Sequence, residues 1–170
     1  MSETIILVDK QDNQIGTIEK LPAHEQAVLH RAFSLYIFNK KGELLIQKRN
    51  RDKYHSGTLW SNTCCSHPRH KEGMQNAIHR RLEEEFGIDT EMNEIFSTIY
   101  KCKFDNGLSE HEYLHVFIGY YDGEVNPSPT ETEDYKWIKP KELLEGIKNN
   151  PEKYSYWLKD CIDRVLKFVK

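Results

Sequence analysis

Residues 60–88 read WSNTCCSHPRHKEGMQNAIHRRLEEEFGI, and this stretch decides the fold that we expect for the chain. Its second half carries apolar residues at spacings of three and four, the pattern of a helix that buries one face. These residues are Met74, Ala77, Ile78, Leu82 and Phe86. Gly87 follows directly, and glycine is typical of a helix C-terminus. The stretch therefore predicts a charged amphipathic helix.

The first half of the same stretch gathers reactive side chains. Cys64, Cys65, His67 and Arg69 lie close together in the sequence. A thiol becomes reactive beside positive charge, and an imidazole is a common ligand of divalent metals. The pattern fits a metal ligand beside a nucleophile or acid, but it also fits an ordinary loop with two buried thiols. This segment alone leaves both interpretations open.

The polar face of the helix is dense in charge. Arg80 and Glu84, like Arg81 and Glu85, are four residues apart, the spacing of weak ion pairs on a solvated helix. Glu83 to Glu85 are consecutive, and at about 100° per residue at most two of these side chains can face one cation. One or two of the carboxylates are therefore candidates for a functional role.

The segments before residue 60 predict two β-hairpins. Residues 4–9 and 14–18 are rich in β-branched residues, and residues 33–38 and 44–49 form a second apolar pair. Gly42 lies in the turn of the second hairpin, where a positive φ is expected.

A third hairpin is predicted after the helix, from residues 95–104 and 110–121 around an Asn-Gly turn. Because alternate residues of a strand share one face, Glu110 and Glu112 continue a row that is otherwise apolar. If the end of this row opens into a cleft, they form a metal clamp or an acid/base pair. If it emerges into water, they are ordinary charges at a strand end.

The remaining segments predict connections and C-terminal helices. We expect a loop at residues 20–30, a surface connection at 122–133, a short strand at 135–138, a helix at 141–147 and a final helix from Pro151. In the final helix Trp157 lies on an apolar stripe. A tryptophan there is a core residue by default, but it can also line a pocket.

The composition predicts one domain, residues 1–170, with a substantial core. The chain has 24 basic and 27 acidic residues and a net charge of -3, so we expect no nucleic-acid or membrane partner. The four cysteines match no zinc-ribbon spacing and favour a reducing compartment. With no apolar run of about 20 residues and no signal-peptide pattern at the start, we expect a soluble, cytoplasmic protein.

Counted from Ser66, the sequence resembles the Nudix box G-x5-E-x7-R-E-U-x-E-E-x-G-U. It reads Ser66-x5-Glu72-x7-Arg80-Arg81-Leu82-x-Glu84-Glu85-x-Gly87-Ile88. Ser66 replaces the glycine of the box, and Arg81 replaces a glutamate that Nudix hydrolases use for catalytic magnesium. The resemblance implies a Nudix-type α+β fold, a mixed β-sheet between helices, but it puts diphosphate hydrolysis in doubt.

Further motifs resemble the type I isopentenyl-diphosphate delta-isomerase family. They are residues 62–68, NTCCSHP; the paired histidines of residues 24–33, HEQAVLHRAF; and Glu110-His111-Glu112. These motifs occur in the order of that family, between about Gly16 and Trp157. The resemblance implies reversible isomerisation of isopentenyl diphosphate to dimethylallyl diphosphate, a reaction of isoprenoid precursor biosynthesis. It implies no flavin, and we expect a monomer or weak dimer.

The resemblance also implies site residues. Zinc or manganese would be held by His24, His30, His67, Glu110 and Glu112, with the segment between His24 and His30 one residue shorter than expected. Magnesium would bind with the substrate diphosphate and Glu85. Diphosphate contacts would come from Lys20, Arg49, Lys53 and Arg81. Proton transfer would use Cys65 on one side of the substrate and Glu112, assisted by Tyr100, on the other, under an aromatic lid formed by Trp157.

Two alternatives remain open at this stage. Glu72, Arg80, Glu84 and Glu85 fit a pyrophosphohydrolase that acts on a nucleoside diphosphate derivative. The second alternative is a catalytically silent zinc-binding module that contacts other proteins through its charged helix. Cys64 is expected to pack inward, and a structural or solvent-facing position is expected for His55, His70, His79, His111 and His115.

Overall fold

The structure is a computed structural model that describes residues 3–169. Over these residues the strands form one nine-stranded sheet, in which β3 pairs with β1, β4 and β6 antiparallel and with β8 parallel. The strands are β1 (Thr4–Val8), β2 (Gln14–Glu19), β3 (His30–Phe38), β4 (Leu44–Arg49), β5 (Trp60–Ser61), β6 (Cys64–Ser66), β7 (Met92–Lys103), β8 (Ser109–Tyr120) and β9 (Thr132–Ile138). The helices are α1 (Lys20–Gln26), α2 (Met74–Phe86), α3 (Pro140–Asn149) and α4 (Tyr156–Val165).

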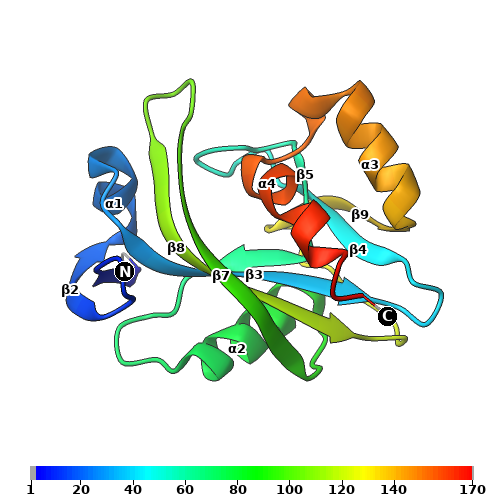
Figure 1. Cartoon of the computed structure of the whole chain (residues 1–170), viewed down its shortest axis with the longest axis horizontal. Helices are drawn as coiled ribbons and strands as arrows, with labels where there is room; N and C mark the ends of the chain where they lie inside the picture. Colours follow the sequence, from blue (N-terminus) through cyan, green and yellow to red (C-terminus); the bar gives the residue numbers. More distant parts are fainter. Residues whose placement is uncertain (1–2, 170) are drawn as a thin grey trace.

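Helices cover both faces of the sheet (Figure 1), as the α+β expectation requires. Along β3, Phe33, Leu35 and Ile37 pack with the apolar stripe of α2, whereas Ala32 and Tyr36 belong to the core beneath α3 and α4. This division follows from the two-residue period of a strand. The core is therefore two apolar layers separated by the sheet.

The pairing register of β3 assembles chemistry from distant segments. In its parallel ladder with β8, His30 lies opposite Glu112, and in its antiparallel ladder with β6, Ser34 lies opposite Cys65. Pairing with the central strand β3 thus brings together His30, Cys65 and Glu112, which come from three distant segments of the sequence.

The elements predicted from local patterns are present. The three hairpins pair antiparallel, and α2 has its predicted stripe buried. Gly42, Gly87 and Gly107 have φ values of 72°, 61° and 86°, so each takes the left-handed conformation that its turn or helix end requires. Local propensity and tertiary structure agree at these positions.

Three expected boundaries were wrong. Residues 20–26 form helix α1, not a loop; with only seven residues and no apolar stripe, this helix has no periodic signal. Pro151 starts a 3₁₀ turn, Pro151–Lys153, and the last helix begins only at Tyr156. Strand β9 begins at Thr132, earlier than predicted, because it pairs with β4 along its full length.

The helices of residues 3–169 are all too short or too polar to cross a lipid bilayer.

Candidate active site

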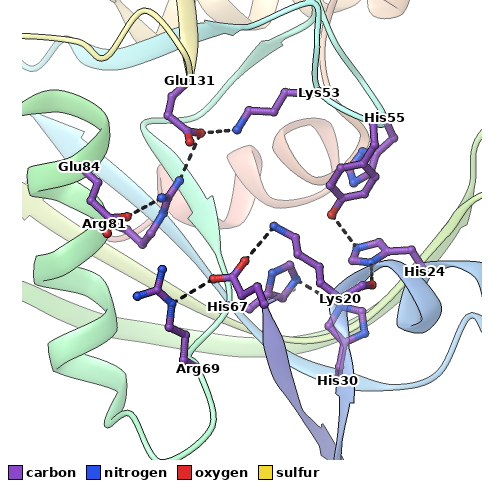
Figure 2. A network of polar contacts seen from close by, with 12 residues as sticks. Lys20, His24, His30, Lys53, His55, His67, Arg69, Arg81, Glu84 and Glu131 are labelled. Carbon is purple, nitrogen blue, oxygen red and sulfur yellow. Dashed lines mark hydrogen bonds and ion pairs between the residues drawn. The ribbon is translucent and has the colours of Figure 1, made fainter. Parts of the chain in front are cut away.

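Three imidazoles and a carboxylate meet at the N-terminal ends of β3 and β8. His24 comes from α1, His30 from β3, His67 from the segment after β6 and Glu110 from β8, and their ligand atoms lie within 4.8 Å of one another. All four side chains are buried, and the three imidazoles lie together in Figure 2. Glu112 adjoins the group, with its Oε1 3.0 Å from His67 Nε2 and 3.7 Å from His30 Nε2.

Backbone carbonyls orient two of the imidazoles. His24 Nδ1 is 2.6 Å from the Lys20 carbonyl oxygen, and His30 Nδ1 is 2.9 Å from that of Val28. A carbonyl oxygen only accepts, so each Nδ1 carries the proton and each Nε2 turns a lone pair toward the group. Metal-bound histidines in proteins are held in the same way.

These donors fit a divalent metal ion. The Nε2 atoms of His30 and His67 are 3.2 Å apart, and His30 Nε2 and Glu110 Oε2 are 3.7 Å apart. Ligand atoms about 2.0–2.2 Å from a tetrahedral ion are separated by about 3.3–3.6 Å. Glu110 Oε2 is buried and has no hydrogen-bond partner among residues 3–169. Imidazole and carboxylate ligands suit zinc or manganese, so the site would satisfy this oxygen by binding such an ion.

The protonation states of His67 and Glu110 agree with metal binding, whereas at His30 burial acts to lower the pKa but the hydrogen bond and charge of Glu112 outweigh it and raise it. Burial lowers the pKa of His67 to about 4, so this imidazole is neutral at neutral pH. Burial acts to raise the pKa of Glu110, but its contacts with His24 and His55 outweigh burial and hold that pKa well below its usual range. A neutral imidazole and an ionised carboxylate are the forms that coordinate metals.

Strand alternation separates the adjacent cysteines of β6. Cys64 is buried on the α2 side of the sheet, where its thiol donates to Glu85 Oε1 at 3.3 Å. Cys65 points to the opposite face and lines the cleft beside the candidate metal ligands. Its Sγ is 3.2 Å from Asn62 Oδ1 and 3.1 Å from Ser34 Oγ. The inward packing expected for Cys64 is therefore confirmed.

The cleft also holds a hydrogen-bonded Tyr–Glu pair. Tyr100 and Glu112 are cross-strand partners on β7 and β8, and the Tyr100 hydroxyl donates to Glu112 Oε2 at 2.8 Å. Burial raises the pKa of the Cys65 thiol to about 12, despite hydrogen bonds with Ser34 and Asn62 that act the other way. Burial and the charge of Glu112 raise the pKa of Tyr100. Cys65 and Tyr100 thus both keep their protons at neutral pH.

The sequence-predicted site residues are brought together. Those that line one cleft are Lys20, Arg49, Lys53, Cys65, His67, Arg81, Glu85, Tyr100, Glu110, Glu112 and Trp157. His24 and His30 do not line it but contact Glu110, with Nε2–carboxylate distances of 3.2 and 3.7 Å. The shorter segment between these histidines therefore does not keep His24 from the group. The cleft therefore has the candidate cation site at one end and a basic wall of four side chains around it, Lys20, Arg49, Lys53 and Arg81.

Two carboxylates neutralise part of this basic wall. Glu131 lies between the Lys53 ammonium and the Arg81 guanidinium, as Figure 2 shows, with 3.2 Å between Arg81 Nη2 and Glu131 Oε2. Glu85 is bound by Arg81 and Cys64 through Oε1 and by Gln47 Nε2, at 2.8 Å, through Oε2. An anion that enters the cleft therefore meets Lys53 and Arg81 already paired with carboxylates.

Trp157 is both a core residue and a cleft residue. Only 3 % of it is exposed, and its indole N–H donates to Ser61 Oγ at 2.8 Å. The Arg49 guanidinium lies 5.1 Å from its ring centre, within cation–π range. The two interpretations of this tryptophan are thus compatible.

The sequence predictions missed several residues of the cleft. His55, expected to be structural or solvent-facing, is buried with its Nε2 2.8 Å from Glu110 Oε1. Glu131 was assigned to a surface connection and turns into the cleft instead. Gln47 lies on a strand that was predicted from its apolar residues, without a role for this glutamine. None of the three belongs to a periodic pattern or a metal-ligand spacing, so no local signal separates them from ordinary polar residues.

Comparison with known proteins identifies the fold. Residues 28–161 match the NUDIX domain family model. The chain superposes on a crystal structure from Deinococcus radiodurans with a TM-score of 0.79 and 19 % identity, over 95 % of this chain and 98 % of the other. A MutT protein from Methanosarcina mazei gives a TM-score of 0.66 with 20 % identity, over 80 % and 91 %. The protein has the Nudix fold.

Sequence relatives define the family within that fold. Isopentenyl-diphosphate Delta-isomerase 2 of Aromatoleum aromaticum is 48 % identical over 98 % of this chain and 88 % of the relative. The isopentenyl-diphosphate Delta-isomerase of Burkholderia multivorans is 44 % identical over 96 % and 93 %. The chain belongs to the isopentenyl-diphosphate Delta-isomerase family.

Proposed function

We propose that the protein is an enzyme that interconverts isopentenyl and dimethylallyl diphosphate, a reaction that supplies isoprenoid precursors. The single observation that carries the proposal is the arrangement of the cleft. A protonated thiol, Cys65, and a Tyr100–Glu112 pair line the same cleft as a cation site and a wall of basic side chains. Family membership supports the same reaction.

The reaction needs two proton-transferring groups. One carbon of the allyl unit gains a proton and another loses one, so the double bond moves and the overall composition is unchanged. In our proposal Cys65 works on one side of the alkene and Glu112, hydrogen-bonded to Tyr100, on the other. One side gives a proton while the other accepts one, through a transition state with tertiary carbocation character. A single group cannot easily reach both sides.

His24, His30, His67, Glu110 and Glu112 would hold a zinc or manganese ion. Such an ion supplies positive charge that makes a proton on the neighbouring Glu112 more acidic. Protonating an unactivated alkene requires a strong acid, so this position for Glu112 suits the chemistry. The identity of the metal is part of the proposal.

The basic wall would bind the diphosphate. Lys20, Arg49, Lys53 and Arg81 provide point charges and planar guanidinium groups that match phosphate oxygens. Glu85, paired with Arg81, would share a magnesium ion with the diphosphate. Because five carbons offer little to hold, the diphosphate supplies the binding energy that positions the alkene.

Trp157 would close the apolar part of the cleft. Water would trap the cationic intermediate as an alcohol, so it has to be excluded. The π face of an indole also attracts positive charge. Because the contributing residues run from Lys20 to Trp157, we propose that residues 1–170 act as one catalytic domain.

Incubation with isopentenyl diphosphate in D₂O tests the proposal. With Mg²⁺ and either Zn²⁺ or Mn²⁺, we expect dimethylallyl diphosphate to form and deuterium to enter the substrate carbons, as followed by NMR and mass spectrometry. If neither product nor deuterium appears, the proposal is wrong. A panel of nucleoside diphosphate derivatives is the counter-test, in which phosphate release would favour a hydrolase instead. The arginine at position 81, where hydrolases carry a glutamate, makes that outcome unexpected.

A further inference from the structure

His55 lies outside every role assigned so far, yet it is in direct contact with the candidate metal site. It is 6 % exposed and belongs to the loop between β4 and β5. Its Nε2 is 2.8 Å from Glu110 Oε1, shorter than the 3.2 Å from that oxygen to His24 Nε2. The group of four converging ligand atoms does not include it.

Neighbouring side chains hold the His55 ring on several sides. It stacks on Phe104 with the planes 7° apart and the centres 4.4 Å apart. The Trp157 ring is nearly perpendicular to it, with the ring centres 5.9 Å apart and the planes at 86°. Its Nδ1 is 3.2 Å from Ser56 Oγ. Because the ionised Glu110 carboxylate only accepts, the proton belongs on Nε2, which faces it, and the serine hydroxyl can donate to Nδ1.

This hydrogen bond distinguishes the two oxygens of Glu110. Oε1 accepts from His55, whereas Oε2 is buried without a hydrogen-bond partner among residues 3–169 and faces His30 Nε2 at 3.7 Å. The terminal torsion of a glutamate is broad, so the backbone alone does not set the orientation of its carboxylate. Among the described residues, the imidazoles near Glu110 are those of His24, His30 and His55, and only His55 is not a candidate metal ligand.

We propose that His55 is a positioning residue of the metal site: it donates its Nε2–H to Glu110 and fixes the carboxylate with its other oxygen toward the ion. The imidazole also joins this carboxylate to the aromatic wall of Phe104 and Trp157. The inference rests on the metal site that the proposed function requires. It goes beyond that function in assigning a role to a residue that carries none in the proposed chemistry.

Two substitutions separate the hydrogen bond from the packing. His55→Phe keeps a flat ring against Phe104 but removes the donor, and His55→Gln places an amide N–H near the position of Nε2. We expect His55→Phe to weaken Zn²⁺ binding by about 10- to 100-fold, the usual effect of losing a hydrogen bond to a metal ligand, and His55→Gln to retain most of the affinity. Competition against a chromogenic chelator measures this affinity, and the visible spectrum of the Co²⁺-loaded protein reports the ligand geometry.

Controls make the result independent of folding and of catalysis. His70 is exposed and outside the cluster, so His70→Phe and His70→Gln should leave affinity and spectrum unchanged. If His55→Phe does not fold, as judged by circular dichroism, His55→Asn replaces it, because the shorter amide cannot reach Glu110. Wild-type affinity and Co²⁺ spectrum in the donor-free variant would overturn the proposal, as would equal loss in His55→Gln. If metal binding depends on His55 but no isomerase activity is found, only the proposed function fails.

Discussion

At the scale of single residues, the separation of Cys64 and Cys65 is the most consequential feature of the site. The two thiols are chemically identical and adjacent, and only the pleat of β6 sends one to the α2 core and the other to the cleft. Their substitutions should therefore have different effects.

We expect Cys65→Ala to lower turnover by about 10²- to 10⁴-fold, the contribution of a general acid or base, and to leave bound metal unchanged. Cys64→Ala should cost about 1 kcal/mol of stability and alter turnover only slightly, because this thiol lies in the α2 core and faces away from the cleft. Isomerase assays and metal analysis of both variants test the prediction. Equal metal loss in Cys65→Ala and in His67→Ala would make Cys65 a ligand and would contradict the proposed role.

Glu131 supports a second prediction at this scale. Burial acts to raise its pKa, but its contacts with Lys53 and Arg81 outweigh burial and lower it, so the ionised carboxylate occupies two cations of the proposed diphosphate site. Glu131→Gln should therefore bind inorganic pyrophosphate severalfold more tightly, as measured by calorimetry without magnesium. Glu133→Gln is the matched control, since Glu133 pairs with Lys48 and Arg51 outside the cleft. Weaker binding in Glu131→Gln would mean that this carboxylate supports anion binding.

At the scale of elements, α2 is held to the segment before it by a two-point ion pair. Arg80 Nε is 2.6 Å from Glu72 Oε1, and Arg80 Nη2 is 2.8 Å from Glu72 Oε2. The same carboxylate accepts the backbone N–H of Arg69 at 2.9 Å. The box residues Glu72 and Arg80 therefore have a structural role here, because they fix the loop that carries His67 against the helix.

The Glu72–Arg80 pair should make the free energy of unfolding fall when the solution becomes acidic. The hydrogen bonds from Arg80 hold the pKa of Glu72 below 4.5, so its stabilising contribution is full above pH 4.5 and is lost as pH falls through the lowered pKa. Glu72→Gln should be less stable by about 1 kcal/mol at pH 7, with a difference that shrinks below pH 4.5. Urea unfolding across this range measures it, with Glu83→Gln on the same helix as control. A difference that persists unchanged into acid would contradict the ionic origin.

Short elements matter as much as long ones for the site. Helix α1 ends at Gln26, and the next residue, Ala27, has a φ of 52° that lets the chain turn back into β3. His24 and His30 thereby approach the same point from a helix and from a strand. The loop between β4 and β5 similarly carries Lys53 to the basic wall and His55 to Glu110.

At the scale of the whole molecule, the cation site joins α1, β3, β8 and the segment after β6. An ion bound there stabilises the native state, because the unfolded chain cannot hold these ligands together. Removing the ion with a chelator should lower the melting temperature, by the equivalent of about 3 kcal/mol if the metal had been present at about 100 times its Kd. Adding Zn²⁺ or Mn²⁺ back should restore it. A melting temperature that chelation does not change would contradict a metal at this position.

Much of the molecule could be predicted from local sequence. The stripe of α2, the glycine that ends it, the Asn-Gly turn of the β7–β8 hairpin and the face that Glu110 and Glu112 share with the apolar row of β8 depend on neighbouring residues only, so local patterns predict them. The box motif and the paired histidines extended these predictions to the family and to the candidate ligands.

The tertiary structure decided which polar side chains meet. His55 and Glu131 are separated by 55 and 21 residues from Glu110 and appear as loop residues in the sequence, yet one contacts that glutamate and the other the basic wall. Such contacts depend on strand register and on loops folding over the end of a sheet, and no local pattern records them. The sequence by itself therefore determined most of the elements, the family and the candidate ligands, whereas the packing of distant segments decided how their charges and hydrogen bonds are paired.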